Sequence, residues 1–180
     1  NSTNILLIIY LDKVYSLINK NQHTLYCGIA YIDSLTGESG MLQYPQREQI
    51  NDAIIYDEII KFITIKNPQE IKIYTNNLGL YEHKIKNILH LQNYNANVYI
   101  DTLKSDFKKK TFQENIFNQI YTNNTKQHIF NYLNIYDDHH IKIVLTILLD
   151  YILSVNLNLL HRIQKPDKIL NTSNNLILGN

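Results

Sequence analysis

The sequence of 180 residues lacks the features that mark several specialised protein classes. Its one cysteine, Cys27, cannot form a disulfide within the chain, and the pattern G-x-x-x-x-G-K-[ST] of phosphate-binding loops is absent. The chain has no tryptophan, five glycines and three prolines. Its net charge of +1 excludes a strong overall field for nucleic acid or membranes. With 44% hydrophobic residues, the chain is long enough for one globular domain with a substantial core.

The apolar runs of the chain do not indicate membrane insertion. The longest, residues 141–160, contains charged and amide side chains, which are costly inside a bilayer, so a buried helix is expected. No basic region precedes the apolar residues 5–10, so no signal peptide is expected. We therefore expect an intracellular protein with no membrane partner.

The periodicity of the apolar residues predicts strands early in the chain and helices late. Three antiparallel strands are expected at residues 4–14, 25–33 and 39–44. A helix, a strand, a helix and a strand should follow at 49–66, 70–75, 80–91 and 96–102. The remaining chain is expected to be helical at 112–121, 127–133 and 138–156. This order predicts an α/β domain with a ribonuclease H-like (RNase H-like) mixed sheet of about five strands, flanked by helices, and a helical C-terminal part.

Two segments about one helix apart carry the most specific motif. The first is a strand whose small residues Gly28 and Ala30 share one face, which would let another element pack closely against them. A turn ends that strand, and Asn67-Pro68 later stops a helix before a new strand. The motif comprises, in order, Gly28, Asp33, Thr36, Gly37, Pro68 and Glu70.

In order and spacing, this motif resembles the connector domain of MutS-type DNA mismatch repair proteins. That family has a glycine, an apolar strand, an aspartate and a Thr-Gly turn, and about one helix later a Pro-x-Glu before a strand. Leu35 departs from the family, which usually has a small hydroxyl residue there. The resemblance implies an RNase H-like connector domain at residues 1–158. It also implies a link and a first strand of the core and lever region at 159–180.

The resemblance further implies a module that joins the mismatch-binding and ATPase parts of a DNA-binding protein in the DNA-damage response. Its implied partners are other domains of the same MutS-like protein, a MutL-like partner, and DNA bound through the full-length protein. The resemblance implies no catalytic, metal or cofactor site in this chain, because ATP and Mg²⁺ would bind elsewhere. On this interpretation the chain alone is not an enzyme.

The predicted fold leaves a second hypothesis open, a metal-dependent RNase H-like nuclease that uses Asp12 and Asp101. Such enzymes hold metal ions with carboxylates at strand ends. Asp12 is the best candidate because it belongs to the first strand. Turn or solvated-face roles account for the other candidates, Asp33, Asp57 and Glu58. The adjacent His139 and His140 should point in different directions on a helix, which makes them a poor metal pair.

A third hypothesis is a nucleic-acid-binding module built on a basic loop. Lysines can neutralise phosphates, and the neighbouring Phe107 and Phe112 could stack on bases. Asp106 interrupts this cluster, and a solvated loop is the simpler interpretation. The candidate contacts are Lys104, Lys108, Lys109 and Lys110.

Overall fold

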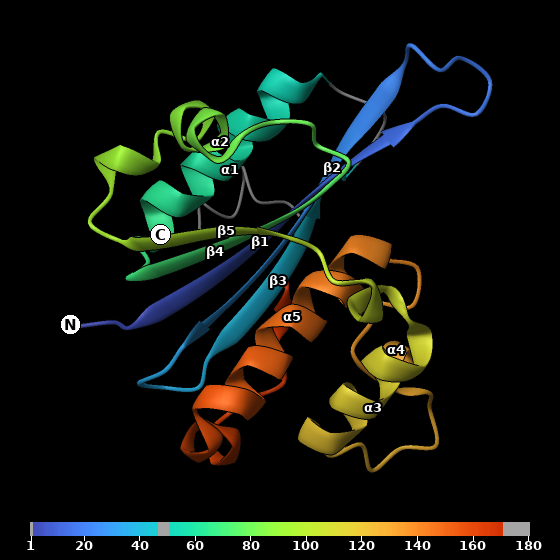
Figure 1. Cartoon of the computed structure of the whole chain (residues 1–180). Coiled ribbons are helices and arrows are strands. Elements are labelled where there is room, and N and C mark those ends of the chain that lie inside the picture. The colour runs from blue at the N-terminus through green and yellow to red at the C-terminus, as the bar shows by residue number, and fades with distance from the viewer. Residues whose placement is uncertain (1, 47–50, 171–180) are drawn as a thin grey trace.

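A mixed sheet of six strands lies at the centre of the molecule and has helices on both faces (Figure 1). The computed structural model describes residues 2–46 and 51–170. The strand order across the sheet is β5-β4-β1-β2-β3-β6. In chain order the strands are β1 (Ile5–Tyr15), β2 (His23–Asp33), β3 (Ser39–Tyr44), β4 (Glu70–Asn76), β5 (Asn97–Thr102) and β6 (Asp167–Lys168).

The register of the sheet determines which side chains can meet at its edge. β1 pairs antiparallel with β2 and parallel with β4, and β5 pairs parallel with β4. Parallel strands point the same way, so the C-terminal ends of β1, β4 and β5 lie at one edge of the sheet. In this register Asp12 of β1 is the partner of Asn76, the last residue of β4.

The helices form two layers, one on each face of the sheet. Figure 1 shows α1 and α2 over one face and α5, with α3 and α4 beside it, over the other. The α-helices are α1 (Asp52–Lys66), α2 (Glu82–Ile88), α3 (Lys110–Ile120), α4 (Ile129–Tyr132) and α5 (His139–Val155). Among the described residues there are also three short 3₁₀ segments: η1 (Leu91–Asn93), η2 (Ser105–Lys108) and η3 (Leu157–His161).

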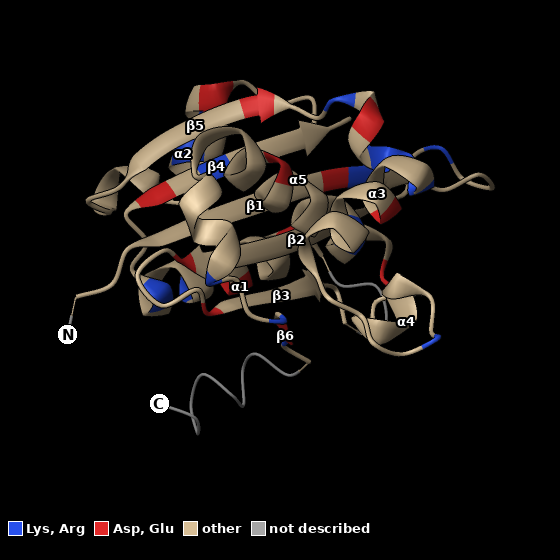
Figure 2. Cartoon of the chain, turned by 90° about the horizontal axis from the view of Figure 1, so that it is seen from below, with Lys and Arg blue, Asp and Glu red and all other residues tan. Residues whose placement is uncertain are grey.

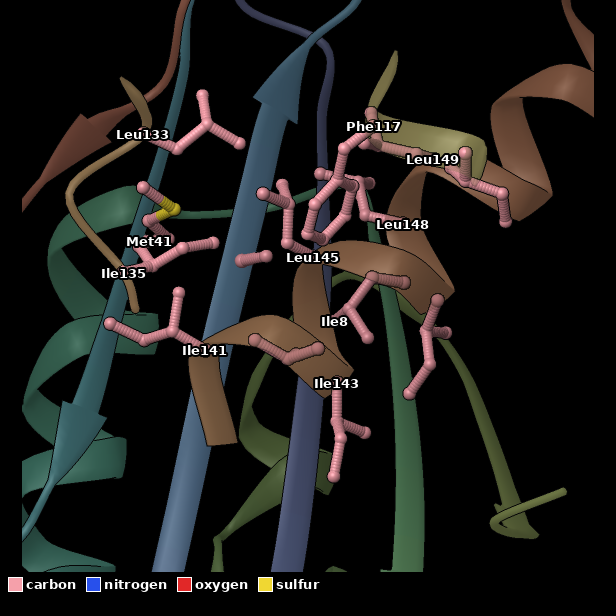
Figure 3. Close-up of a cluster of buried hydrophobic side chains, with 14 of the residues drawn as sticks. Ile8, Met41, Phe117, Leu133, Ile135, Ile141, Ile143, Leu145, Leu148 and Leu149 are labelled. Atoms are coloured by element: carbon pink, nitrogen blue, oxygen red, sulfur yellow. The ribbon is translucent and has the colours of Figure 1, made fainter. Parts of the chain in front are cut away.

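The long helix α5 is the main element packed on its face of the sheet. Figure 3 shows Leu145 and Leu148 of α5 in one cluster with Ile8 of β1, Met41 of β3 and Phe117 of α3, all of them buried. This burial accounts for the apolar run at 141–160, because a helix between a sheet and other helices needs few polar side chains. Within the part of the chain that the structure describes, no helix is long and apolar enough to cross a membrane.

Local sequence explains where α1 begins and ends. The Asn51 side chain accepts a hydrogen bond from the Ile54 N–H at 3.1 Å and caps the first turn. At the other end, Asn67 adopts a left-handed conformation with φ 49°, and Pro68 follows it. A proline cannot continue the ladder of helical hydrogen bonds, so the chain turns into β4.

The predicted fold class is confirmed: the chain has an RNase H-like α/β fold with a mixed sheet flanked by helices. All five predicted strands are present. The sixth, β6, was missed because two residues without alternation give no strand signal. The helix predicted at 80–91 is shorter, since α2 ends at Ile88 and η1 follows.

The first part of the expected link at 159–180 lies along the edge of the sheet. The Gln164 N–H donates to the Gly37 carbonyl at 3.2 Å, and the Ile169 N–H donates to the Met41 carbonyl at 2.9 Å. Lys168 forms an ion pair with Asp138 at 2.6 Å. The expected final strand at 171–180 lies outside the described residues, and the division of the chain after residue 158 stays a prediction.

Candidate functional site

A buried carboxylate, Asp12, lies where β1 and β4 approach their C-terminal ends. Only 6% of Asp12 is exposed. Its Oδ1 accepts a hydrogen bond from Asn76 Nδ2 at 2.9 Å, and its Oδ2 lies 2.9 Å from His140 Nε2. These partners come from β4 and α5, so segments far apart in the sequence converge on one carboxylate.

Gly28 allows α5 to come close enough for this contact. A Cβ at Gly28 would lie 2.5 Å from the His140 carbonyl oxygen and 3.1 Å from Val144 Cγ1. The absence of a side chain on β2 therefore lets the first turn of α5 lie directly on the sheet. This confirms the prediction that the face with Gly28 and Ala30 accommodates a closely packed element.

Two tyrosine rings hold the His140 imidazole in place. Tyr26 stacks on it with ring centroids 4.6 Å apart and an interplanar angle of 7°, and Tyr10 lies 5.8 Å away at 30°. His139 is exposed, and its ring is nearly perpendicular to that of His140, at 89°. The two histidines therefore point in different directions, as predicted, but the inner one is a partner of Asp12.

The basic loop is connected to the same site. Lys108 of η2 donates to Asn76 Oδ1 at 3.1 Å, so Asn76 bridges Lys108 and Asp12. Figure 2 shows that Lys and Arg residues (blue) occur at the end of the sheet where the β1–β2 hairpin projects. We define the Asp12 cluster as Asp12, Asn76, Lys108 and His140.

The Asp12 cluster favours an ionised carboxylate. Burial raises the pKa of Asp12, but hydrogen bonds from His140 and Asn76 and the charges of His140 and Lys108 outweigh this effect and lower it below its usual value. An ionised carboxylate only accepts hydrogen bonds, so the proton between the two groups belongs to His140 Nε2. The site thus holds a fixed negative charge between an imidazole N–H and an amide.

The donor atoms of the Asp12 cluster suit one divalent cation better than a pair. Asp12 supplies carboxylate oxygens, which are ligands for divalent metals, whereas His140 Nε2–H donates to Asp12 and Asn76 Oδ1 accepts from Lys108. In residues 2–46 and 51–170, no three His, Cys, Asp or Glu side chains come together as a metal-binding group. A carboxylate-rich two-metal site is therefore not formed by this part of the chain.

The structure separates the second predicted nuclease residue from the first. Asp101 lies on β5, two strands away from β1, and pairs in register with Tyr74 rather than with Asn76. It is exposed, and its Oδ1 accepts a hydrogen bond from the N–H of Thr102 at 2.7 Å. Asp33 caps a turn by accepting from the Leu35 N–H at 3.0 Å, and Asp57 is exposed on α1. Asp12 is thus the one predicted acid that belongs to the site.

The four lysines of the basic loop are all exposed but differ in their contacts. Lys109 forms an ion pair with Asp106 at 2.7 Å, and Lys110 lies 3.8 Å from Glu114. Lys104 acts electrostatically on Asp150 of α5, and Lys108 faces the Asp12 cluster. The aromatic rings of Phe107 and Phe112 pack 5.7 Å apart against the core, so they do not form a surface for stacking bases. Lys108 is therefore the lysine that the structure connects to the site.

The remaining motif residues shape turns and strand ends. Gly37 has φ 79° and lies so close to the Arg162 carbonyl that a Cβ would overlap it. The Thr36 side chain accepts from the Glu38 N–H at 3.1 Å. Pro68 is buried after α1, and Glu70 lies 3.5 Å from Lys72. These positions stabilise the fold away from Asp12.

Sequence reasoning missed Asn76 and His140 as site residues. The signal for Asn76 was its place as the polar residue directly after a predicted strand that runs parallel to the first. His140 was judged only as a partner of His139, although it opens the helix that covers the sheet. The pairing of β4 with β1 brings Asn76 to Asp12, and the close approach of α5 to Gly28 brings His140 there. Both depend on residues far apart in the sequence.

Among known proteins, similarity to this chain was found in solved structures and not in the sequence comparisons. No family model matches the chain, and no curated protein matches it. The fowlpox virus Holliday junction resolvase matches with 13% identity and a TM-score of 0.41, over 83% of this chain and 99% of its own. RuvC of T. thermophilus, in complex with a Holliday junction substrate, matches with 9% identity and a TM-score of 0.38, over 84% of this chain and 96% of its own. The simian T-cell lymphotropic virus intasome, in complex with a PP2A regulatory subunit, matches with 12% identity and a TM-score of 0.29, over 77% of this chain and 46% of that one.

These neighbours contradict the resemblance to MutS connector domains, because the first two are Holliday junction resolvases. The prediction of a mismatch-repair connector is therefore corrected, together with the statements that rested on it. Those were that the chain alone is not an enzyme and that it takes no cofactor. At 9–13% identity and TM-scores below 0.5 the neighbours assign no activity to this chain.

Proposed function

We propose that this chain is a nuclease of RNase H-like fold that hydrolyses phosphodiester bonds, with the Asp12 cluster as its active site. One observation carries the proposal: the Asp12 carboxylate is buried near the carboxyl ends of parallel strands and held by side chains from β4 and α5. In open α/β sheets, ligands bind beyond the carboxyl ends of the strands. Groups whose pKa values are shifted by burial and by specific partners also concentrate at functional sites.

The residues of the cluster suit the chemistry of a phosphodiester. Asp12 would hold a divalent cation through its carboxylate, while the His140 Nε2–H and the Asn76 amide orient that carboxylate by hydrogen bonds. Such an ion, when bound, polarises a phosphoryl oxygen and lowers the pKa of water. Lys108 adds a positive charge that can contact a phosphate, and its link to Asn76 keeps that charge beside the carboxylate. The Tyr26 and Tyr10 rings fix the imidazole, so His140 is positioned before a substrate binds.

A second candidate function is nucleic-acid binding without cleavage. It is favoured by the exposed lysines of the basic loop, of which Lys108 reaches the Asp12 cluster. On this account the carboxylate is a structural element that positions Asn76 and α5, as buried ion pairs do in other proteins. The two functions differ in one outcome, because only the nuclease changes the length of its ligand.

The test is a cleavage assay on the full chain with Mg²⁺ or Mn²⁺, using single-stranded and double-stranded DNA, RNA and a four-way DNA junction. Asp12→Asn keeps the shape and can still hydrogen-bond, but it removes the charge. The matched control is Asp57→Asn, the same change at an exposed acid on the opposite helical layer. We expect Asp12→Asn to lower the cleavage rate at least 100-fold and Asp57→Asn to leave it within twofold, as for other groups that stabilise a transition state.

Two results would refute the nuclease proposal. The first is that the wild-type chain cleaves none of these substrates with either metal, although it is folded by circular dichroism. The second is that Asp12→Asn cleaves as fast as the wild type, which would place the activity elsewhere. Binding without cleavage, measured by fluorescence anisotropy, would support the second candidate function.

A further inference from the structure

The β1–β2 hairpin projects beyond the body of the molecule (Figure 1), and its tip carries the apolar residues Leu17 and Ile18. Leu17 is 100% exposed and Ile18 is 99% exposed. The strand before the tip continues this surface, since Val14 and Tyr15 are also exposed. Single exposed apolar residues are common, but two adjacent aliphatic side chains at the apex of a projection indicate a contact surface.

The loop that presents these side chains has a defined conformation. The Ser16 side chain accepts hydrogen bonds from the N–H groups of Ile18 and Asn19, both at 3.2 Å. Asn19 Oδ1 accepts from the Asn21 N–H at 3.1 Å, and the Ser16 N–H donates to the Gln22 carbonyl at 2.9 Å. Polar residues thus brace the loop from within, while the two apolar residues face outward. Little conformational entropy remains to be lost when a ligand covers the tip.

Charge favours a polyanionic ligand for this hairpin. Residues 13–23 contain Lys13 and Lys20 and no acidic residue. Next to the tip, where His23 pairs with Tyr15, His23 contacts Asp52 of α1 at 2.8 Å. Further along the hairpin, Lys108 lies beside Asp12 through Asn76. An apolar tip flanked by lysines combines an element that can enter between bases with charges that neutralise phosphates.

The spacing between the tip and the Asp12 cluster fits one continuous duplex. Leu17 follows Asp12 by five residues along β1 and its turn. At about 3.3 Å per residue, the tip lies at most ~16 Å from Asp12, because β1 ends at Tyr15 and the chain then turns. Base pairs repeat every ~3.4 Å along each strand, so this distance spans at most about five base pairs. A duplex with its backbone at Lys108 and Asp12 can therefore reach the hairpin tip.

We propose that Leu17 and Ile18 form a wedge that inserts between base pairs of double-stranded DNA bound at the Asp12 cluster and bends it. This inference rests on the proposed function and names its substrate class, a duplex that can be unstacked locally. Aliphatic side chains of minor-groove proteins act in this way by partly unstacking one base step. Pyrimidine–purine steps such as TA unstack most easily, whereas A-tracts are stiff. The wedge therefore favours duplexes with a flexible step within about five base pairs of the phosphate at Asp12.

The test uses Leu17→Ser/Ile18→Ser in the full chain, with EDTA present so that cleavage does not interfere. The probe is a duplex with a central TA step that carries 2-aminopurine, whose fluorescence rises when it is unstacked. We expect the wild type to raise this fluorescence, and the double variant to lose the rise and bind at least tenfold more weakly. Burial of aliphatic side chains accounts for a loss of this size.

Two controls separate the wedge from general surface effects. Leu157→Ser/Leu170→Ser removes two residues that are each 62% exposed and lie outside the hairpin, and it should change affinity less than twofold. Leu17→Met/Ile18→Met keeps apolar side chains and should retain the fluorescence rise. An A-tract duplex should bind more weakly than the TA duplex to the wild type but equally to the serine variant.

The outcomes distinguish this inference from the proposed function. The wedge is refuted, and the nuclease proposal is not, if Leu17→Ser/Ile18→Ser cleaves duplex DNA at the wild-type rate and keeps the wild-type affinity and fluorescence rise. A chain that unstacks the probe through these residues but never cleaves would refute the nuclease and leave the wedge intact. If the substitutions instead abolish a dimer in sedimentation experiments without changing DNA affinity, the tip is a protein contact and the wedge is wrong.

Discussion

Gly28→Ala tests whether close approach of α5 assembles the Asp12 cluster. The added Cβ would lie 2.5 Å from the His140 carbonyl oxygen, and that atom belongs to the backbone, so a side-chain rotation cannot relieve the contact. The first turn of α5 must therefore move by about 1 Å to restore an ordinary van der Waals distance. A shift of this size would weaken the 2.9 Å hydrogen bond between His140 and Asp12.

The magnitude of the effect follows from the cost of overpacking a core. We expect Gly28→Ala to lower the free energy of unfolding by about 1–3 kcal/mol. For a domain of this size, this corresponds to a decrease in Tm of about 4–8 °C for a loss near 2 kcal/mol. The same displacement should lower the cleavage rate at least tenfold, because a 1 Å misplacement of a catalytic group costs about that much or more.

Urea unfolding monitored by circular dichroism measures the stability of Gly28→Ala, and the cleavage assay measures its activity. Val144→Ala in the Gly28→Ala background is an informative companion. It removes the Val144 Cγ1 contact at 3.1 Å but leaves the closer backbone contact, so it should not restore stability. An unchanged unfolding midpoint in Gly28→Ala would show that α5 does not rest on Gly28 and would refute the reasoning.

Three further predictions concern the charges and the thiol. The lowered pKa of Asp12 means that its stabilising contribution is complete above the unfolded pKa near ~4 and is lost as the pH falls through the lower folded value. Urea unfolding between pH 2 and 6 should therefore show a loss of stability in acid that is smaller in Asp12→Asn. An equal loss in both proteins would contradict the hydrogen-bonded state of the buried carboxylate. In anisotropy titrations, Lys108→Gln should weaken nucleic-acid binding about three- to tenfold and reduce the number of salt ions released on binding by about one. Lys109→Gln should have less effect, because Lys109 is already paired with Asp106. Burial covers the Cys27 thiol and raises its pKa, so the native protein should react with a thiol reagent only as fast as it unfolds. Faster labelling would show that β2 is exposed.

The fold could be predicted from the sequence because its signals are local. The apolar alternation of the strands, the period of α1 and the stop at Asn67-Pro68 each depend on a few neighbouring residues. The small β6 strand escaped prediction because its pairing with β3 is made by the backbone and depends on the preceding segment. Local patterns therefore predicted the order of the longer elements but not the short edge strand β6.

The site could be predicted only in part, for a related reason. Asp12 was identified because the metal chemistry of RNase H-like enzymes needs a carboxylate in the first strand. Its partners Asn76 and His140 lie 64 and 128 residues further along the chain, and no spacing rule connects them. The resemblance to a connector domain relied on turn and strand-end residues that stabilise the fold. It therefore gave no information about the role of Asp12.

The most direct test of the account is the single-turnover cleavage rate of a labelled DNA duplex by the wild-type chain and by Asp12→Asn, with Mn²⁺ and with EDTA. We predict cleavage by the wild type that EDTA abolishes and that Asp12→Asn reduces at least 100-fold, while both proteins show the same circular dichroism spectrum. Equal rates for the two proteins, or no cleavage by a folded wild type, would contradict the assignment of the Asp12 cluster as an active site.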